Sequence, residues 1–225
     1  MELHELKGGY DVLCSLGHNC LPASQLNHSK IRNIAGVIDW MISPHLSGVS
    51  ALLRDRFRHI MLRDNLRYYG ASIDSGCYVI RDAAYDLYSV HDFPMEDNDP
   101  EILESYSGLK QKLDYRATRF LQLMQSGKRI FFLRTEATSH ETEELLQVLD
   151  DLVAGDYKLL VVNHAQVPYI VQIDYQLPNV CTLLIPEVAN MFQDNHTLWR
   201  TILGGIYNTM TNEEINSYLL QNYNI

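Results

Sequence analysis

Short runs of mostly apolar residues alternate along the chain with stretches of helical periodicity. The clearest succession is a mostly apolar run at 129–134, an amphipathic stretch at 138–153 and a second mostly apolar run at 157–163. A strand with an apolar interior is typical of a sheet covered on both faces, and a helix between two such strands is typical of a parallel crossover. This segment therefore predicts a βαβ unit.

Further elements are predicted on both sides of this unit. The run at 12–16 predicts another buried strand. Helices are predicted at residues 46–57, 100–125, 199–207 and 211–223, and β-hairpins from residues 77–80 with 85–93 and from residues 169–175 with 180–185. The pattern as a whole predicts a single α/β domain over residues 1–225, with a mixed sheet flanked by helices and edge hairpins.

The composition narrows the classes of partner. With 18 Lys and Arg against 28 Asp and Glu, the net charge is −10, so a nucleic-acid surface is not expected. No run approaches the roughly 18 apolar residues of a membrane span. The four cysteines lack CxxC spacing and the histidines lack the spacing of metal ligands. We therefore expect reduced thiols, no metal, no cofactor and a cytoplasmic location.

The strand at 12–16 leads into the stretch Gly17-His18-Asn19-Cys20, where chemistry is expected. Gly17 permits a sharp exit from the strand, and Pro22 favours the first turn of a helix. A cysteine at such a turn faces unpaired backbone N–H groups and the positive end of a helix dipole, which favour the thiolate. Cys20 is therefore a candidate nucleophile, whereas Cys14, inside the strand, is expected to be a buried hydrophobic residue.

A thiol nucleophile needs a base, and His91 is the candidate. It lies at the end of a predicted strand beside Asp92, and histidine titrates near neutral pH. Asp39 interrupts an apolar segment before Trp40, so its carboxylate should be hydrogen-bonded, paired with a cation or lining a cleft. Either aspartate is a candidate to orient the imidazole.

Parallel strands bring their carboxyl ends to one edge of a sheet, where ligands bind. The candidate substrate-binding residues are Ser15, Gly17, His18, Asn19, Trp40, Arg134 and Asn163. Arg134 is suited to anchoring a carboxylate or phosphate, although an arginine at a strand end often serves a structural ion pair. The expected substrate is a small molecule or a peptide.

Several of these motifs resemble a family of unknown function described as putative papain-like cysteine peptidases. The motifs are Ser15-Leu16-Gly17, Asn19-Cys20, Asp39-Trp40, residues 79–82 and His91-Asp92-Phe93, and the resemblance extends over residues 10–163. It implies a nucleophile at Cys20, a base at His91 and an acidic partner at Asp39 or Asp92. It also implies a nucleophile on a helix that packs against an antiparallel sheet. Where the family has Pro-Phe before Asp-Trp, this chain has Val37-Ile38.

Three functions remain open from the sequence. The first is cysteine-dependent acyl transfer, hydrolytic or to another acceptor. The second is a doubly wound, glycosyltransferase-like enzyme that binds an anionic or nucleotide-sugar donor through Arg134 and the turn at 17–20, with Asp39 as base. The third is a binding protein without turnover. A distance within about 4 Å between the sulfur of Cys20 and the ring of His91 would favour the first.

Overall fold

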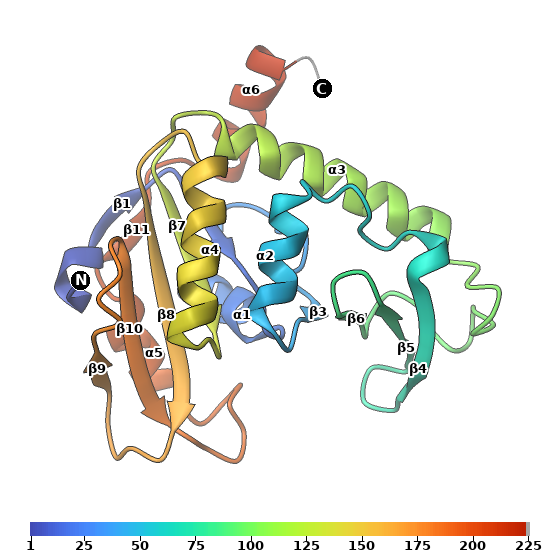
Figure 1. The fold of residues 1–225 in the computed structure, drawn as a ribbon, viewed down its shortest axis with the longest axis horizontal. Helices are drawn as coiled ribbons and strands as arrows, with labels where there is room; N and C mark the ends of the chain where they lie inside the picture. The colour runs from blue at the N-terminus through green and yellow to red at the C-terminus, as the bar shows by residue number, and fades with distance from the viewer. Residues whose placement is uncertain (224–225) are drawn as a thin grey trace.

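The computed structural model describes residues 1–223 and has an α/β architecture (Figure 1). Its main sheet has five strands in the order β2-β7-β8-β10-β9. Their bounds are β2 (Val12–Ser15), β7 (Ile130–Thr135), β8 (Tyr157–Ala165), β9 (Val171–Ile173) and β10 (Val180–Pro186). All neighbouring pairs are parallel except β9 with β10, which is antiparallel at one edge. The βαβ prediction is confirmed, because α4 (Ser139–Leu152) connects the parallel strands β7 and β8.

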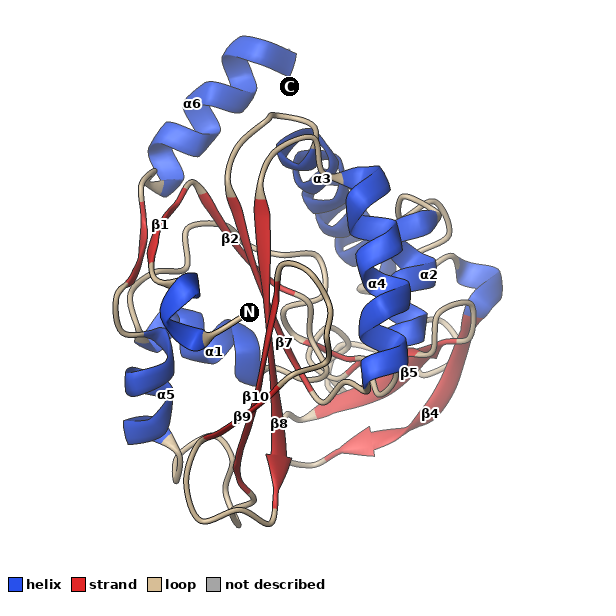
Figure 2. Ribbon diagram, turned by 60° about the vertical axis from the view of Figure 1, so that its left-hand side comes forward, coloured by secondary structure: helices blue, strands red, loops and turns tan. Residues whose placement is uncertain are grey.

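Helices cover both faces of the main sheet (Figure 2). On one face lie α2 (Leu46–Arg54), α3 (Tyr106–Met124) and α4, and on the other lie α1 (Leu21–His28) and α5 (His196–Leu203). The side chains of alternate residues in β7 point to opposite faces of the main sheet. Ile130 and Phe132 join the hydrophobic cluster beneath α2, α3 and α4, while Phe131 and Leu133 join the cluster beneath α1 and α5. The apolar run Ile130–Leu133 of β7 is therefore buried on both sides of the sheet.

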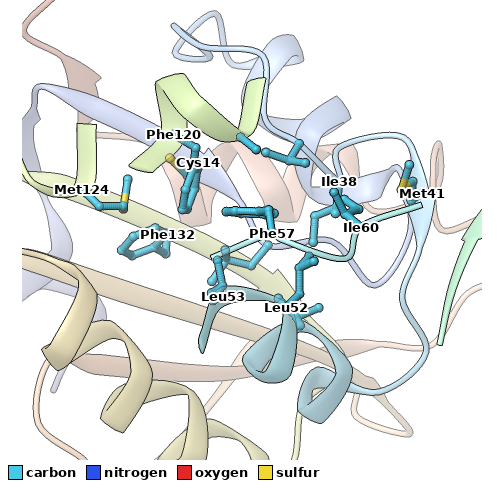
Figure 3. Packing of buried hydrophobic residues seen from close by; sticks show 14 of the residues in the cluster. Cys14, Ile38, Met41, Leu52, Leu53, Phe57, Ile60, Phe120, Met124 and Phe132 are labelled. Carbon is cyan, nitrogen blue, oxygen red and sulfur yellow. The ribbon is translucent and has the colours of Figure 1, made fainter. Parts of the chain in front are cut away.

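The larger cluster fills the space between the main sheet and the helices α2 and α3 (Figure 3). The rings of Phe57 and Phe120 meet edge to face with their centroids 5.3 Å apart. Truncating a buried phenylalanine of this kind costs about 3–5 kcal/mol. Cys14 lies in the same cluster, and burial raises the pKa of its thiol well above the ordinary value. Cys14 is thus a small hydrophobic residue of the core.

A second, antiparallel sheet has the strand order β3-β6-β5-β4. Its strands are β3 (Met41–Ile42), β4 (Leu66–Ser72), β5 (Cys77–Asp82) and β6 (Leu87–Ser89), with a 3₁₀-helix at Arg63–Asn65 before β4. The first predicted hairpin is confirmed as β5 and β6. Ile80 and Leu87 from this sheet belong to the same cluster as α2 and α3. The two sheets therefore share one core.

The C-terminal part departs from the prediction at one element. The helix predicted at 199–207 ends at Leu203, and β11 (Ile206–Asn208) pairs in parallel with β1 (Gly8–Tyr10). Gly204 and Gly205 separate the two elements, and Gly205 has a φ of +83°, which ends the helix. A 3₁₀-helix at Leu3–Leu6 precedes β1. The second hairpin, β9 with β10, and the last helix, α6 (Asn212–Tyr223), are confirmed.

The longest helix begins at Tyr106 rather than near residue 100. The side chain of Asn98 explains the later start, because it ties the preceding segment into turns. Its Nδ2 donates to the carbonyl of Pro94 and to Oγ of Ser105, each at 2.9 Å, and its Oδ1 accepts from the amide of Ser105 at 2.8 Å. None of the helices within residues 1–223 has the length and apolar character that a bilayer crossing requires.

Candidate active site

The turn between β2 and α1 carries the candidate nucleophile. Gly17 has a φ of +76°, and a Cβ there would lie 2.7 Å from Oγ of Ser43, so both conformation and space require glycine. The amide of Gly17 donates to Oγ of Ser15 at 3.1 Å. Oδ1 of Asn19 accepts from the amide of Leu21 at 2.8 Å, which satisfies one free donor at the start of α1. Cys20 is therefore held directly before the helix.

Cys20 and His91 lie together. The sulfur of Cys20 is 3.6 Å from Nε2 of His91, across 71 positions of the chain. His91 follows β6 of the antiparallel sheet, whereas Cys20 follows β2 of the main sheet. The thiol follows a parallel strand, as the residue pattern predicts. The resemblance implied a helix packed against an antiparallel sheet, and this expectation is wrong, because α1, which begins after Cys20, packs against the parallel strands β2 and β7. Cys20 is partly exposed and His91 is exposed, so a ligand can reach both groups from solvent.

The electrostatic environment of Cys20 differs from the prediction. Burial is the largest effect, and it raises the pKa of the Cys20 thiol. A hydrogen bond from the residue's own backbone N–H lowers the pKa, and the negative charge of Asp39 raises it further. The prediction that the turn by itself favours the thiolate is therefore wrong, because the loss of hydration outweighs the backbone donor. The raised pKa favours the thiol of Cys20 over its thiolate.

The two candidate aspartates have other partners. Asp39 is 2% exposed, and its Oδ2 accepts from Nη2 of Arg32 at 2.6 Å and from the amide of Gly36 at 2.8 Å. Asp92 accepts from Oγ of Ser89 at 2.8 Å and from Nζ of Lys112 at 2.7 Å. Within residues 1–223, neither carboxylate hydrogen-bonds His91. Both aspartates hold the loops that carry the site.

Arg134 lies fully buried beneath the turn. Its Nη1 donates to the carbonyl of Leu16 at 3.0 Å and to Oγ of Ser43 at 2.7 Å, and its Nη2 donates to the carbonyl of Ser43 at 2.8 Å. Burial lowers the pKa of Arg134 to about 9, so the guanidinium stays charged at neutral pH. An anionic ligand could reach these donors only by displacing the bonds. Arg134 therefore fixes the position of Ser43 relative to the end of β2.

Ser43 is the residue of the site that sequence reasoning missed. Its Oγ accepts from the amide of His18 at 2.9 Å as well as from Arg134, and its own amide donates to the carbonyl of His18 at 2.8 Å. The only signal in the sequence was its place before Pro44, which indicates the end of a secondary-structure element. The role of Ser43 depends on segments far apart in the chain, and no local pattern reports it.

The carboxyl edge of the main sheet holds a second polar group. Nδ1 of His164 lies 2.5 Å from Oε1 of Glu136. The side chain of Asn163 bonds both backbone groups of Ala137, accepting from the amide at 2.9 Å and donating to the carbonyl at 2.8 Å. These residues line a cavity of about 450 Å³. Asn163 thus lies at the predicted edge of the sheet, where it secures the turn after β7.

The remaining candidates surround the turn. Ser15 is buried, and His18 is half-buried with a φ of +86°. Burial lowers the pKa of His18, and the nearby guanidinium of Arg134 adds to this effect. Trp40 is 37% exposed, with the guanidinium of Arg32 5.7 Å from its ring centre. Within residues 1–223, no three acidic, histidine or cysteine side chains are arranged to hold a metal ion.

Fold and site together define an α/β protein with a thiol and an imidazole in contact, one from the main sheet's β2–α1 turn and the other from the segment after β6 of the antiparallel sheet. The model of the family described as putative papain-like cysteine peptidases (DUF1796) matches residues 11–167. The chain belongs to this family, and membership supports a cysteine hydrolase-like protein at a coarse level. Neither a curated protein nor a solved structure matches the chain.

Proposed function

We propose that this protein is a cysteine-dependent acyl-transfer enzyme, in which Cys20 is the nucleophile and His91 the general base. The observation that carries the proposal is the 3.6 Å separation between Sγ of Cys20 and Nε2 of His91. A nucleophile and its base lie within or slightly beyond hydrogen-bond reach in enzymes without substrate. The family to which the chain belongs supports the same class of chemistry.

The reaction follows from this pair. His91 accepts the thiol proton as the sulfur of Cys20 attacks the carbonyl carbon of an ester, thioester or amide. The tetrahedral intermediate collapses to an acyl-thioester when the carbon–leaving-group bond breaks, and His91 returns the proton to the leaving group. A water molecule or another acceptor then gives its proton to His91 and attacks the thioester carbonyl. The carbon–sulfur bond breaks to release the acyl group, and His91 returns the proton to the sulfur, which restores the thiol.

Asn19 and the backbone of Cys20 are the proposed donors to the oxyanion. Nδ2 of Asn19 donates to Sδ of Met191 at 3.3 Å, and a thioether is a weak acceptor that an oxyanion can replace. The bond from the amide of Leu21 to Oδ1 of Asn19 holds the side-chain amide beside the nucleophile. A fixed donor aimed at the developing negative charge supplies about 2.7–4 kcal/mol of transition-state stabilisation in comparable enzymes.

The glycosyltransferase-like alternative has less support. Its donor would need a cationic anchor, and the guanidinium of Arg134 is bonded to Leu16 and Ser43. The cavity at the carboxyl edge is lined by the acidic side chains of Glu136 and Glu141, which repel a phosphate-bearing ligand. The contact between Cys20 and His91 also has no part in that reaction.

The test uses iodoacetamide and the ester p-nitrophenyl acetate. On the native protein we expect Cys20 to be alkylated before Cys14, Cys77 and Cys181, because these three are at most 4% exposed. Alkylation should abolish hydrolysis of the ester, and Cys20→Ser should lower kcat/KM by about 100-fold or more. Cys181→Ser is the matched control and should keep wild-type activity. An unmodified Cys20 in the folded protein, or an active Cys20→Ser variant, would overturn the proposal.

A further inference from the structure

The antiparallel sheet turns a partly apolar face away from the core. In β5 and β6, Ile80 and Leu87 are fully buried in the cluster beneath the helices. The neighbouring positions Val79 and Tyr88 lie on the opposite face and are partly exposed. A sheet with one solvated face usually carries polar residues there. Next to the charged positions Arg67 and Arg81, this face also carries aliphatic and aromatic side chains.

These outward side chains enclose a cavity of about 540 Å³. Ile42, Ala71, Val79 and Val90 supply apolar surface, and the rings of Tyr69 and Tyr88 meet edge to face with their centroids 5.0 Å apart. Among residues 1–223, no charged side chain lines the cavity, although 20% of the residues in the chain are charged. Its volume lies within the roughly 300–1,000 Å³ of small-molecule pockets, and its lining suits an uncharged group.

Two segments of the cavity lining lead directly to the reacting pair, although Cys20 and His91 are not themselves lining residues. Val90 lines the cavity and directly precedes His91. Ile42 and Pro44 line it from the other side and flank Ser43, whose Oγ and amide both bond the backbone of His18. The lining is therefore continuous with the segment that carries the base and with the turn that carries the thiol.

We infer that this cavity binds an uncharged, apolar acyl group, aliphatic or aromatic, whose carbonyl carbon is the one attacked by Cys20. The inference rests on the proposed function and specifies its substrate class. Burial of apolar surface in a preformed pocket discriminates by about 10-fold to 200-fold for each methylene of fit. Esters, thioesters or amides of medium-length or phenyl-bearing acids are therefore the substrates that this site favours over acetyl compounds.

The experiment compares p-nitrophenyl acetate, p-nitrophenyl hexanoate and p-nitrophenyl 4-phenylbutyrate, each corrected for spontaneous hydrolysis. For the wild type we expect kcat/KM to be at least about 10-fold higher for the two larger esters. Val79→Phe fills the cavity from β5, and Val167→Phe makes the same change in the loop after β8, outside the lining. Both valines are partly exposed, so both variants are expected to fold.

Val79→Phe should bring the preference for the larger esters close to one. Val167→Phe should keep the wild-type preference. Ser72 pairs with Cys77 and shares the face of Val79, so Ser72→Phe is the second variant if Val79→Phe does not fold. Binding of hexanamide, followed by tyrosine fluorescence, should weaken about 10-fold in the filled variants.

The outcomes separate the two proposals. Cys20-dependent hydrolysis with equal rate constants for acetate and hexanoate would overturn the inference and leave the proposed function standing. An unchanged preference for the larger esters in both variants that fill the cavity would also overturn the inference and leave the proposed function standing. If hydrolysis of all three esters were unaffected by Cys20→Ser, the proposed function would fail, and the assignment of the cavity to its acyl group would fail with it.

Discussion

Sγ of Cys20 and Nε2 of His91 lie 3.6 Å apart, although one residue follows a strand of the main sheet and the other a strand of the antiparallel sheet. Their separation therefore depends on how the two sheets are held together. Arg134 of β7 makes that connection, because its guanidinium donates twice to Ser43, directly after β3. The buried contact between Arg134 and Ser43 thus keeps the thiol and the imidazole in reach of each other.

The first prediction concerns Ser43. Ser43→Ala removes the oxygen that accepts from both Arg134 and the amide of His18, so two donors lose a partner. We expect a loss of about 1–3 kcal/mol in the free energy of unfolding, measured in urea, and slower ester hydrolysis. Ser50→Ala is the matched control, because Oγ of Ser50 is equally buried and has no hydrogen-bond partner within the described residues. Equal effects of the two substitutions would contradict the prediction.

His91→Gln tests the base. The substitution keeps a polar side chain near Cys20 but removes the group that accepts the thiol proton. Ester hydrolysis should fall by about 10²-fold to 10⁴-fold in kcat, while the circular dichroism spectrum stays unchanged. His59→Gln serves as control, since His59 is exposed and bonds Asp55 away from the site. A His91→Gln enzyme within threefold of wild type would rule out His91 as the base.

At position 17, we predict that both the positive φ and the lack of space for a side chain require glycine. Gly17→Ala and Gly127→Ala both place a side chain at positive φ, at +76° and +69°, and each should cost about 1–2 kcal/mol of stability. Only at Gly17 would the new Cβ meet Oγ of Ser43, at 2.7 Å, whereas no atom of residues 1–223 lies within 4 Å of it at Gly127. We therefore expect only Gly17→Ala to alter the rate at which iodoacetamide modifies Cys20. The same rate in both variants would show that the turn tolerates the side chain.

Asp39→Asn separates a structural from a catalytic role. Breaking the buried pair with Arg32 should lower the free energy of unfolding by about 3 kcal/mol. Because the charge of Asp39 raises the pKa of Cys20, its removal should lower that pKa and accelerate alkylation at pH 7. Asp114→Asn, in an exposed pair with Lys110, should change neither quantity. Unchanged stability together with lost turnover would instead indicate that Asp39 takes part in catalysis.

His18 should make the stability of the protein depend on pH. Burial lowers the pKa of His18 in the folded state, so below about pH 6.5 the unfolded chain binds a proton that the folded chain resists. Stability therefore falls as the pH decreases from about 6.5 toward the lowered pKa. His18→Asn, which tolerates the positive φ, should flatten this part of the profile in urea titrations from pH 5 to 8. His140→Gln, at an exposed histidine, should leave the slope as in the wild type.

The local patterns predicted most of the elements. The apolar runs of β7 and β8 with the amphipathic helix between them led to the parallel crossover, and the β-formers around residue 80 led to the hairpin of β5 and β6. The segment at 206–208 was wrongly assigned to a helix. It forms a strand because β1, almost 200 positions earlier in the chain, offers it a partner. Pairing over that distance leaves no periodic signal.

By itself, the sequence determined the α/β class, the βαβ unit and the turn that holds Cys20 before a helix, because apolar spacing, glycine and proline act over neighbouring residues. The tertiary structure alone decided which side chains meet. It brought His91 to Cys20, paired Asp39 with Arg32, and buried Arg134 against Ser43. It also reversed the expected effect on the Cys20 pKa, since desolvation depends on every segment that packs around the thiol.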